Sequence, residues 1–227
     1  MPRLHLLRVF CSDDGSGGNA LGVFLDGASI PEPSRQAVAL ELGLSETVFV
    51  DDAAAGRVRI FTPAVELPFA GHPSVGTAWL LAEQGIPVTA LNPPAGEVAV
   101  RHERGLTFCS ARPEWSPPFE WIELGSPDEV DALDGVQPGH DLTGYWAWID
   151  ERSGAIRARV FPVRIGIDED EATGSAVVLL ARQLERAIDV RQGRGSRLRA
   201  RPQAAGRVEF GGRSVLDEAR EYAVPSR

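Results

Sequence analysis

Apolar and polar residues alternate along many short stretches of the chain, a pattern that predicts β-strands separated by turns. We expect strands at residues 3–10, 20–25, 44–50, 58–61, 88–91, 96–101, 106–111, 121–124, 145–149, 156–163, 197–201, 207–210 and 214–216. The pair Gly211-Gly212 is predicted to form a turn before the last strand, because paired glycines break strands. So many short strands indicate a fold dominated by sheet.

Three longer stretches have the apolar spacing of helices. The first covers residues 31–42 and ends at Gly43, a residue type favoured at helix C-termini. The other two, at about residues 73–84 and 173–188, are apolar on nearly every side. A helix without a polar face is buried, so each of these helices is expected to lie inside a wrapping sheet.

A repeat links the two apolar helices to the segments before them. The stretch V-E-L-P-F-A-G-H-P-S-V-G-T-A-W-L-L-A, which starts at Val65, matches D-E-A-T-G-S-A-V-V-L-L-A from Asp170 without a gap. This superposition places His72 on Asp170 and Gly76 on Gly174, and the upstream segments R-V-R-I-F-T-P and R-A-R-V-F-P match as well. Two copies about 100 residues apart are too distant for a solenoid, so we interpret the repeat as a gene duplication.

The duplication predicts an α+β fold of two pseudo-symmetric halves. Each half is expected to be a strongly curved, mostly antiparallel sheet wrapped around one central buried helix. The first half would be residues 1–111 with its helix at about 73–84, and the second residues 112–227 with its helix at about 173–188, the C-terminal residues being free to return to the first half. A chain of 227 residues, 43% of them apolar, is long enough to bury a core in each half.

The starts of both apolar helices are rich in small residues, which leave the backbone accessible. Free N–H groups at a helix N-terminus carry roughly half a positive charge and attract anions. If the two halves face each other, both N-termini converge on one cleft, with His72 on one side and Asp170 on the other. This arrangement predicts a binding site for a small carboxylate.

Composition removes several other functions. The net charge of −9 argues against nucleic-acid binding, and all 23 basic residues are arginine, so no lysine can form a Schiff base. Cys11 and Cys109 form no C-x-x-C motif, and the four histidines have no metal-ligand spacing, so we expect no metal and no disulfide. No apolar run approaches 18 residues and no leader is evident, which predicts a soluble, cytoplasmic protein.

Several motifs together resemble a known family. They are V-F-C followed by G-N-A, L-S-E-T-V-F-V, R-I-F-T-P-A-V-E-L-P-F-A-G-H-P-S-V-G-T-A, and R-V-F-P-V-R-I-G-I-D-E-D-E-A-T-G-S-A. In these segments the sequence is similar to the phenazine-biosynthesis isomerase family (PhzF-like proteins), which has the diaminopimelate-epimerase-type fold. The matches cover most of the first half, but only the surroundings of the helix in the second half.

The resemblance implies a cofactor-free isomerase, and it suggests a homodimer. Glu46 would be the acid/base residue, with His72 and Asp170 beside it. The substrate and its carboxylate would be held by Asn19 and by backbone amides around Gly71, His72, Gly174 and Ser175. The residues around Glu46 support this role independently, because burial among apolar neighbours raises the pKa of a carboxyl group and suits it to proton transfer near neutral pH.

Two alternatives to this isomerase remain open. A racemase with two thiols on the same fold would need cysteines at the two helix starts, where His72 and Asp170 stand instead. A binder of small carboxylates without catalysis would use the same anion site. The sequence departs from the family pattern in three features: Ala20 follows Gly-Asn, Glu171 follows Glu-Asp, and the second half is short. These departures leave the substrate undefined.

Overall fold

The structure of the protein is a computed structural model that describes residues 1–225. Its strands are β1 (Arg3–Cys11), β2 (Asn19–Phe24), β3 (Glu46–Asp52), β4 (Arg57–Phe61), β5 (Glu66–Leu67), β6 (Ala90–Leu91), β7 (Val98–Glu103), β8 (Leu106–Ala111), β9 (Glu120–Glu123), β10 (Thr143–Asp150), β11 (Ala155–Phe161), β12 (Ile188–Gln192), β13 (Ser196–Pro202) and β14 (Val208–Glu221). Its α-helices are α1 (Glu32–Leu42), α2 (Gly71–Glu83), α3 (Pro127–Asp131) and α4 (Gly174–Leu184), and four short 3₁₀ turns complete the described elements.

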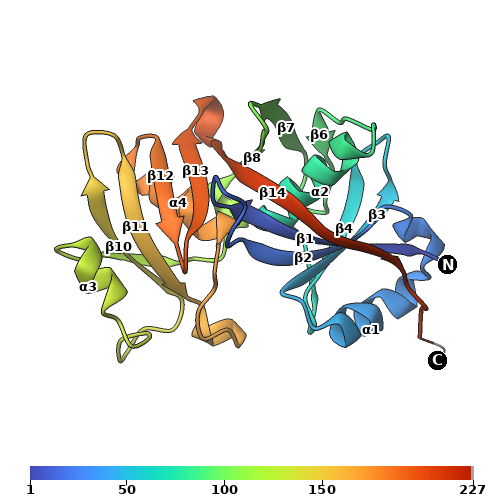
Figure 1. Ribbon diagram of the computed structural model, residues 1–227, viewed down its shortest axis with the longest axis horizontal. Helices are drawn as coiled ribbons and strands as arrows, with labels where there is room; N and C mark the ends of the chain where they lie inside the picture. Colours follow the sequence, from blue (N-terminus) through green and yellow to red (C-terminus); the bar gives the residue numbers. More distant parts are fainter. Residues whose placement is uncertain (226–227) are drawn as a thin grey trace.

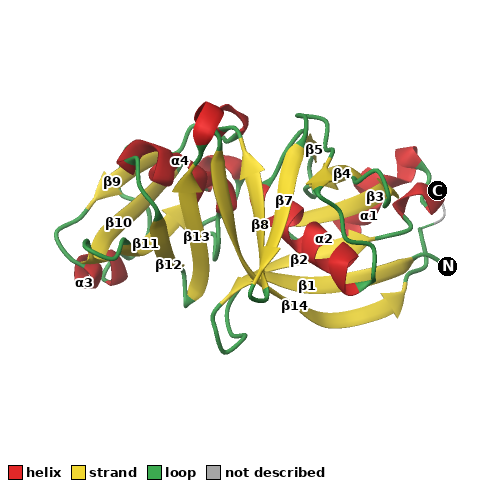
Figure 2. Cartoon of the chain, turned by 90° about the horizontal axis from the view of Figure 1, so that it is seen from above, coloured by secondary structure: helices red, strands yellow, loops and turns green. Residues whose placement is uncertain are grey.

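The strands form one large curved sheet, in which the neighbours run β5-β4-β3-β2-β1-β14-β13-β12-β11-β10-β9. Strands β8, β7 and β6 branch from β14, and Figure 2 shows the curvature of the whole sheet from above. Among the described strands, the parallel pairs are β2/β3, β9/β10 and β11/β12. The fold is therefore α+β with a mostly antiparallel sheet, as the sequence predicts.

Strand β14 crosses from one part of the molecule to the other (Figure 1). Its first residues pair with β8 and β13, whereas its later residues pair with β1. The prediction of a turn at Gly211-Gly212 is wrong, because both residues lie inside this continuous strand. Glycine is needed there for close packing rather than for turning, since a Cβ atom on Gly211 would overlap the carbonyl oxygen of Thr107.

The two apolar helices lie inside the curved sheet. Helix α2 packs against β1, β2, β3, β7, β8 and β14, and α4 packs against β13 and β14. Their core-facing side chains, such as Leu80 and Leu81 on α2 and Val177 and Leu180 on α4, are fully buried, which contributes about 1.5–3 kcal/mol for each large side chain. The prediction of two buried helices is confirmed.

The end of α4 differs from the sequence prediction. The helix stops at Leu184 because Glu185 adopts a left-handed conformation with φ of 51°, and the chain then enters β12 at Ile188. Residues 188–192 therefore belong to a strand, which the continuous apolar pattern before them conceals. Helix α1, in contrast, ends at Gly43 with φ of 61°, as its glycine cap predicts.

Candidate active site

Glu46 is the first residue of β3, next to Leu21 in the parallel strand β2. Its side chain is only 16% exposed. Burial raises the pKa of the Glu46 carboxyl to about 8, and the nearby charge of Asp170 acts in the same direction. The buried Oε2 atom has no hydrogen-bond partner among the described residues. A carboxyl group with this pKa can both accept and return a proton near neutral pH.

His72 is the second residue of α2 and faces Glu46. Its Nε2 atom lies 3.2 Å from Glu46 Oε2, but the angles do not form a hydrogen bond and both atoms lack a partner. Burial lowers the pKa of the His72 imidazole to about 4, opposed in part by a hydrogen bond to the backbone of Ala20. Because Nε2 has no partner, that bond is assigned to Nδ1–H, and the neutral ring presents a bare Nε2 lone pair toward Glu46.

Asp170 lies just before α4 and is fixed from two sides. Its Oδ1 accepts a hydrogen bond from Asn19 Nδ2 at 2.7 Å, and its Oδ2 accepts one from Thr173 Oγ1 at 2.6 Å. Burial raises the pKa of Asp170, while these hydrogen bonds oppose the rise. Ser45 Oγ donates to Asn19 Oδ1 at 3.1 Å. A chain of polar contacts thus connects Asp170 through Asn19 to Ser45, the residue before Glu46.

The N-termini of α2 and α4 meet at Gly71 and Gly174. A Cβ atom on Gly71 would lie 3.0 Å from the Cα of Gly174 and 3.0 Å from the nitrogen of Ser175, so any side chain there would force the two backbones apart. Neither helix has a side-chain hydrogen bond at its N-cap or an acidic residue in its first turn. Two positive helix ends are therefore held together without a capping side chain, an arrangement that an anion would stabilise.

The gapless superposition of the two repeat copies has the wrong register. Helix α2 starts at Gly71 and α4 at Gly174, so His72 corresponds in position to Ser175, not to Asp170. The strand pairing before each helix agrees, since Leu67 pairs with Ile60 as Asp170 pairs with Val160. The G-T-A and G-S-A triplets misled the superposition because one lies inside α2 and the other opens α4.

The described residues give little support to a site with two thiols. Cys109 lies in the core on β8, and burial raises the pKa of its thiol. Burial also raises the pKa of Cys11, at the end of β1. Thiols with raised pKa values are poor acids and bases near neutral pH, and the helix starts hold His72 and Ser175 instead.

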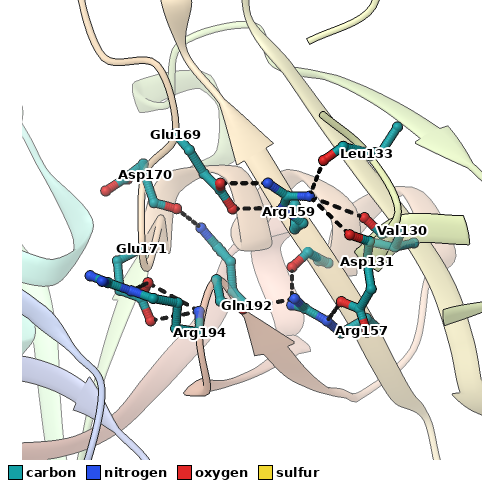
Figure 3. A network of polar contacts seen from close by, with 12 residues as sticks. Val130, Asp131, Leu133, Arg157, Arg159, Glu169, Asp170, Glu171, Gln192 and Arg194 are labelled. Carbon is teal, nitrogen blue, oxygen red and sulfur yellow. Dashed lines mark hydrogen bonds and ion pairs between the residues drawn. The ribbon is translucent and has the colours of Figure 1, made fainter. Parts of the chain in front are cut away.

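Two of the cavities in the protein lie away from Glu46 and His72. The larger, of about 730 Å³, is lined by Arg157, Arg159, Arg191 and Arg194 together with acidic and apolar residues. The guanidinium groups of Arg157 and Arg159 are already engaged by Asp131, Glu169 and backbone carbonyls (Figure 3). Within residues 1–225, no group of three or more His, Cys, Asp or Glu residues is arranged to hold a metal ion. No helix in that range is long and apolar enough to cross a membrane.

Sequence reasoning missed the polar residues that support Asp170. Gln192 on β12 is fully buried, and it donates from Nε2 to the Asp170 carbonyl oxygen at 2.8 Å and to Thr173 Oγ1 at 2.9 Å. Its Oε1 accepts from the backbone nitrogen of Thr173 at 3.2 Å. The one usable signal is a glutamine within an alternating apolar segment, but the sequence pattern predicts a helix up to residue 188 and the next strand only from residue 197.

Comparison with protein families identifies the chain. Residues 7–145 match the family model for phenazine biosynthesis-like proteins, PhzC-PhzF. The chain belongs to this family. A trans-2,3-dihydro-3-hydroxyanthranilate isomerase from Pseudomonas aeruginosa is 32% identical, over 98% of this chain and 100% of that protein. Shorter matches to uncharacterized isomerases of Pasteurella multocida and Mesorhizobium japonicum are 43% and 36% identical, over 44% and 57% of this chain, and span only 36% and 44% of those proteins.

Solved structures show the same fold at low sequence identity. A PhzF-family phenazine biosynthesis protein from Enterococcus faecalis has a TM-score of 0.77 and 21% identity, covering 98% of this chain and 99% of that one. A hydroxyproline epimerase from Agrobacterium vitis has a TM-score of 0.59 and 11% identity, covering 96% and 91%. The expected family and its epimerase-like fold are thereby confirmed, and the named relatives agree with the expectation of an isomerase.

Proposed function

We propose that this PhzF-family protein is a cofactor-independent isomerase that moves a proton within a small cyclic or unsaturated carboxylate. One observation carries the proposal: the buried Oε2 of Glu46, on a carboxyl with a pKa of about 8, has no partner and lies beside two uncapped helix starts. A buried carboxyl oxygen that makes no hydrogen bond, and that costs free energy to bury, is characteristic of a reaction centre.

In the proposed reaction, Glu46 removes a proton from a carbon atom of the substrate and returns it to another carbon. Backbone amides at Gly71, His72, Gly174 and Ser175 bind the substrate carboxylate and stabilise the negative charge that spreads onto it. Asn19 and Asp170 contact the polar substituents of the substrate. His72 keeps its ring neutral and its bare Nε2 beside Glu46, where it accepts a hydrogen bond from the protonated carboxyl during the transfer.

We also propose that the structure of the site comes from duplicated units. The order β3, β4, α2 in the first half repeats as β10, β11, α4 in the second, which supports the division at residues 111 and 112. The two helix starts then belong to different halves and face each other across the site. A homodimer, implied by the family resemblance, is part of the same proposal.

The proposal is tested by isotope incorporation. The printed name of the Pseudomonas aeruginosa relative makes trans-2,3-dihydro-3-hydroxyanthranilate the first compound to incubate with the protein in D₂O, followed by other small unsaturated carboxylates. We expect an isomerised product, and we expect deuterium at the carbon that receives the proton because the Glu46 carboxyl exchanges its proton with D₂O before it returns it; NMR and mass spectrometry detect both. A ligand that binds but returns without isomerisation or exchange would identify a binding protein and refute the isomerase.

A further inference from the structure

Asp170 stands between two glutamates that point away from it (Figure 3). Glu169 pairs with Arg159 on β11 through two hydrogen bonds, of 2.8 and 2.7 Å. Glu171 turns toward the loop between β12 and β13, where its two oxygens lie 3.0 and 3.1 Å from the backbone nitrogen of Arg194. Neither glutamate contacts Glu46. Both hold the loop before α4 and take no part in the proposed reaction.

Ser196 connects Glu171 to the loop before β2. Ser196 Oγ donates to Glu171 Oε1 at 2.8 Å and accepts from the backbone nitrogen of Gly18, also at 2.8 Å. One hydroxyl can do both, since it has one donor and two lone pairs. Ser196 is fully buried, so no water competes for these bonds. The loop before β2 is thereby tied to the loop before α4.

These contacts close a ring. Gly18 precedes Asn19, Asn19 Nδ2 donates to Asp170 Oδ1 at 2.7 Å, and Asp170 is bonded covalently to Glu171. The remaining links are the two bonds of Ser196. A ring of this kind fixes the distance between two chain segments more firmly than any single hydrogen bond, because each link limits the movement of the others.

We propose that Glu171 and Ser196 are positioning residues, which hold Asn19 and Asp170 in register with Glu46. The inference rests on the proposed function and assigns to it two residues that do not touch the substrate. Loss of either residue breaks the ring, and loss of Ser196 also leaves the Gly18 N–H without its bond. Asp170 would then shift relative to Glu46, and a displacement of about 1 Å at a reaction centre can lower the rate by roughly 100-fold.

The test compares Glu171→Ala, Glu171→Gln and Ser196→Ala with Arg194→Ala. Arg194 is the matched control because its backbone nitrogen makes the close contacts, while its side chain is 93% exposed and reaches Glu171 only through Nε at 3.4 Å, a solvent-screened contact. Glu171→Gln keeps an acceptor oxygen for Ser196 and is the rescuing variant. Thermal unfolding identifies any variant that fails to fold. If the variants at one position do not fold, the substitution at the other position, 171 or 196, still tests the proposal.

Two measurements are made on each protein: the kinetics of deuterium incorporation, and a ¹³C NMR titration of the labelled Glu46 carboxyl without substrate. We expect kcat to fall by about 10- to 100-fold in Glu171→Ala and Ser196→Ala with KM changed less than about threefold, as misplacement rather than lost binding predicts. The midpoint of the Glu46 titration should move to lower pH, because the charge of Asp170 no longer lies close enough to raise it. Glu171→Gln should recover part of both effects, and Arg194→Ala should match wild type within about twofold.

The outcomes separate the two proposals. If Glu171→Ala and Ser196→Ala retain wild-type kinetics and an unchanged Glu46 midpoint, the positioning role is overturned while the isomerase stands. If the wild-type protein turns over no compound, the proposed function fails, and the NMR titration still decides whether Glu171 and Ser196 fix the environment of Glu46. An Arg194→Ala effect equal to that of Glu171→Ala would contradict the assigned contact.

Discussion

The two strand–helix units, β3-β4-α2 and β10-β11-α4, have the same strand pairing and the same kind of helix start, but they differ in their polar side chains. Thr47 pairs with Phe61 in the first unit, and Thr143 pairs with Phe161 at the same place in the second. Each unit then passes through a connecting segment into a helix that begins with glycine, although the first connection contains β5 and the second the 3₁₀ turn Val163–Ile165. The common parts are thus the register, the aromatic anchor and the glycine at the helix start.

The residues of the proposed site differ between the two units at every equivalent position. Glu46, which precedes Thr47, corresponds to Leu142, which precedes Thr143 and is buried. His72 corresponds to Ser175, and Leu67 to Asp170. The first unit therefore supplies the carboxyl group that titrates near pH 8 and the imidazole, and the second supplies the charge that helps to raise that carboxyl's pKa. The residues that the two units share carry structure, and the proposed site lies where the two units differ.

The largest effect on the rate is expected from a substitution of Glu46, a position at which the two units differ. Glu46→Gln keeps the shape of the side chain but cannot take a proton, so the rate of isomerisation should fall by about 10²–10⁴-fold, the usual contribution of a general acid/base. Steady-state kinetics on the identified substrate measures the change. Glu123→Gln, an exposed carboxylate on β9, is the control and should retain full activity. Near-wild-type activity of Glu46→Gln would refute the assignment.

The same variant should also change how stability depends on pH. Between the ordinary Glu value of 4.5 and about 8, the unfolded chain has released the Glu46 proton while the folded protein keeps it. Wild-type stability therefore falls as pH rises through this window, relative to Glu46→Gln, by at most about 1.4 kcal/mol per pH unit. The lowered pKa of His72 is common to both proteins and cancels in the difference. Urea unfolding at several pH values from 5 to 9 measures the gap, and a constant gap would show that Glu46 is not perturbed.

A smaller effect is expected at the contact between the two helix starts. Gly71→Ala places a methyl group 3.0 Å from backbone atoms of Gly174, which cannot rotate away as a side chain would. The helix starts should separate, with a loss of about 1–3 kcal/mol in the free energy of unfolding and a fall of roughly 10- to 100-fold in rate. Gly125→Ala is the control, because its nearest neighbour is the flexible end of Glu129. Equal behaviour of both variants would show that the close contact has no role.

Much of this fold follows from local sequence signals. The alternating segments gave most strands, and the lack of a polar face on both central helices required a sheet around them. The glycine at residue 43 gave the end of α1. The family resemblance, carried by L-S-E-T-V-F-V for Glu46 and by E-L-P-F-A-G-H-P for His72, placed these two residues beside each other, and the structure brings them to 3.2 Å.

Other features depend on contacts between distant segments, which no local pattern contains. The pair Gly211-Gly212 looks like a turn, but it serves the close approach of β14 to its neighbours. Gln192 and Ser196 carry no distinctive motif, since their role appears only when the β12–β13 loop lies against Asp170 and Gly18. The repeat register was wrong for the same reason: letters within one helix matched letters at the start of the other.

The smallest expected effect concerns a pair that both units keep. Arg59 binds Glu66 and Arg159 binds Glu169, each from the strand before the helix to the segment that leads into it. Arg159 is the less exposed of the two, at 16% against 28%, and it also donates to backbone carbonyls at the end of α3 and just after it, including that of Leu133.

Replacement by lysine keeps the charge in each unit but removes the two-pronged geometry. We therefore expect Arg159→Lys to lower the free energy of unfolding by about 1–2 kcal/mol, because partly buried carbonyls lose their donor. Arg59→Lys should cost about 0.5–1 kcal/mol, as is usual for a partly exposed ion pair. Urea unfolding of both variants at pH 7 measures the difference. Equal losses would show that the extra carbonyl contacts of Arg159 add nothing, and a larger loss for Arg59→Lys would mean that the first unit, which holds Glu46 and His72, depends more on this pair than the second.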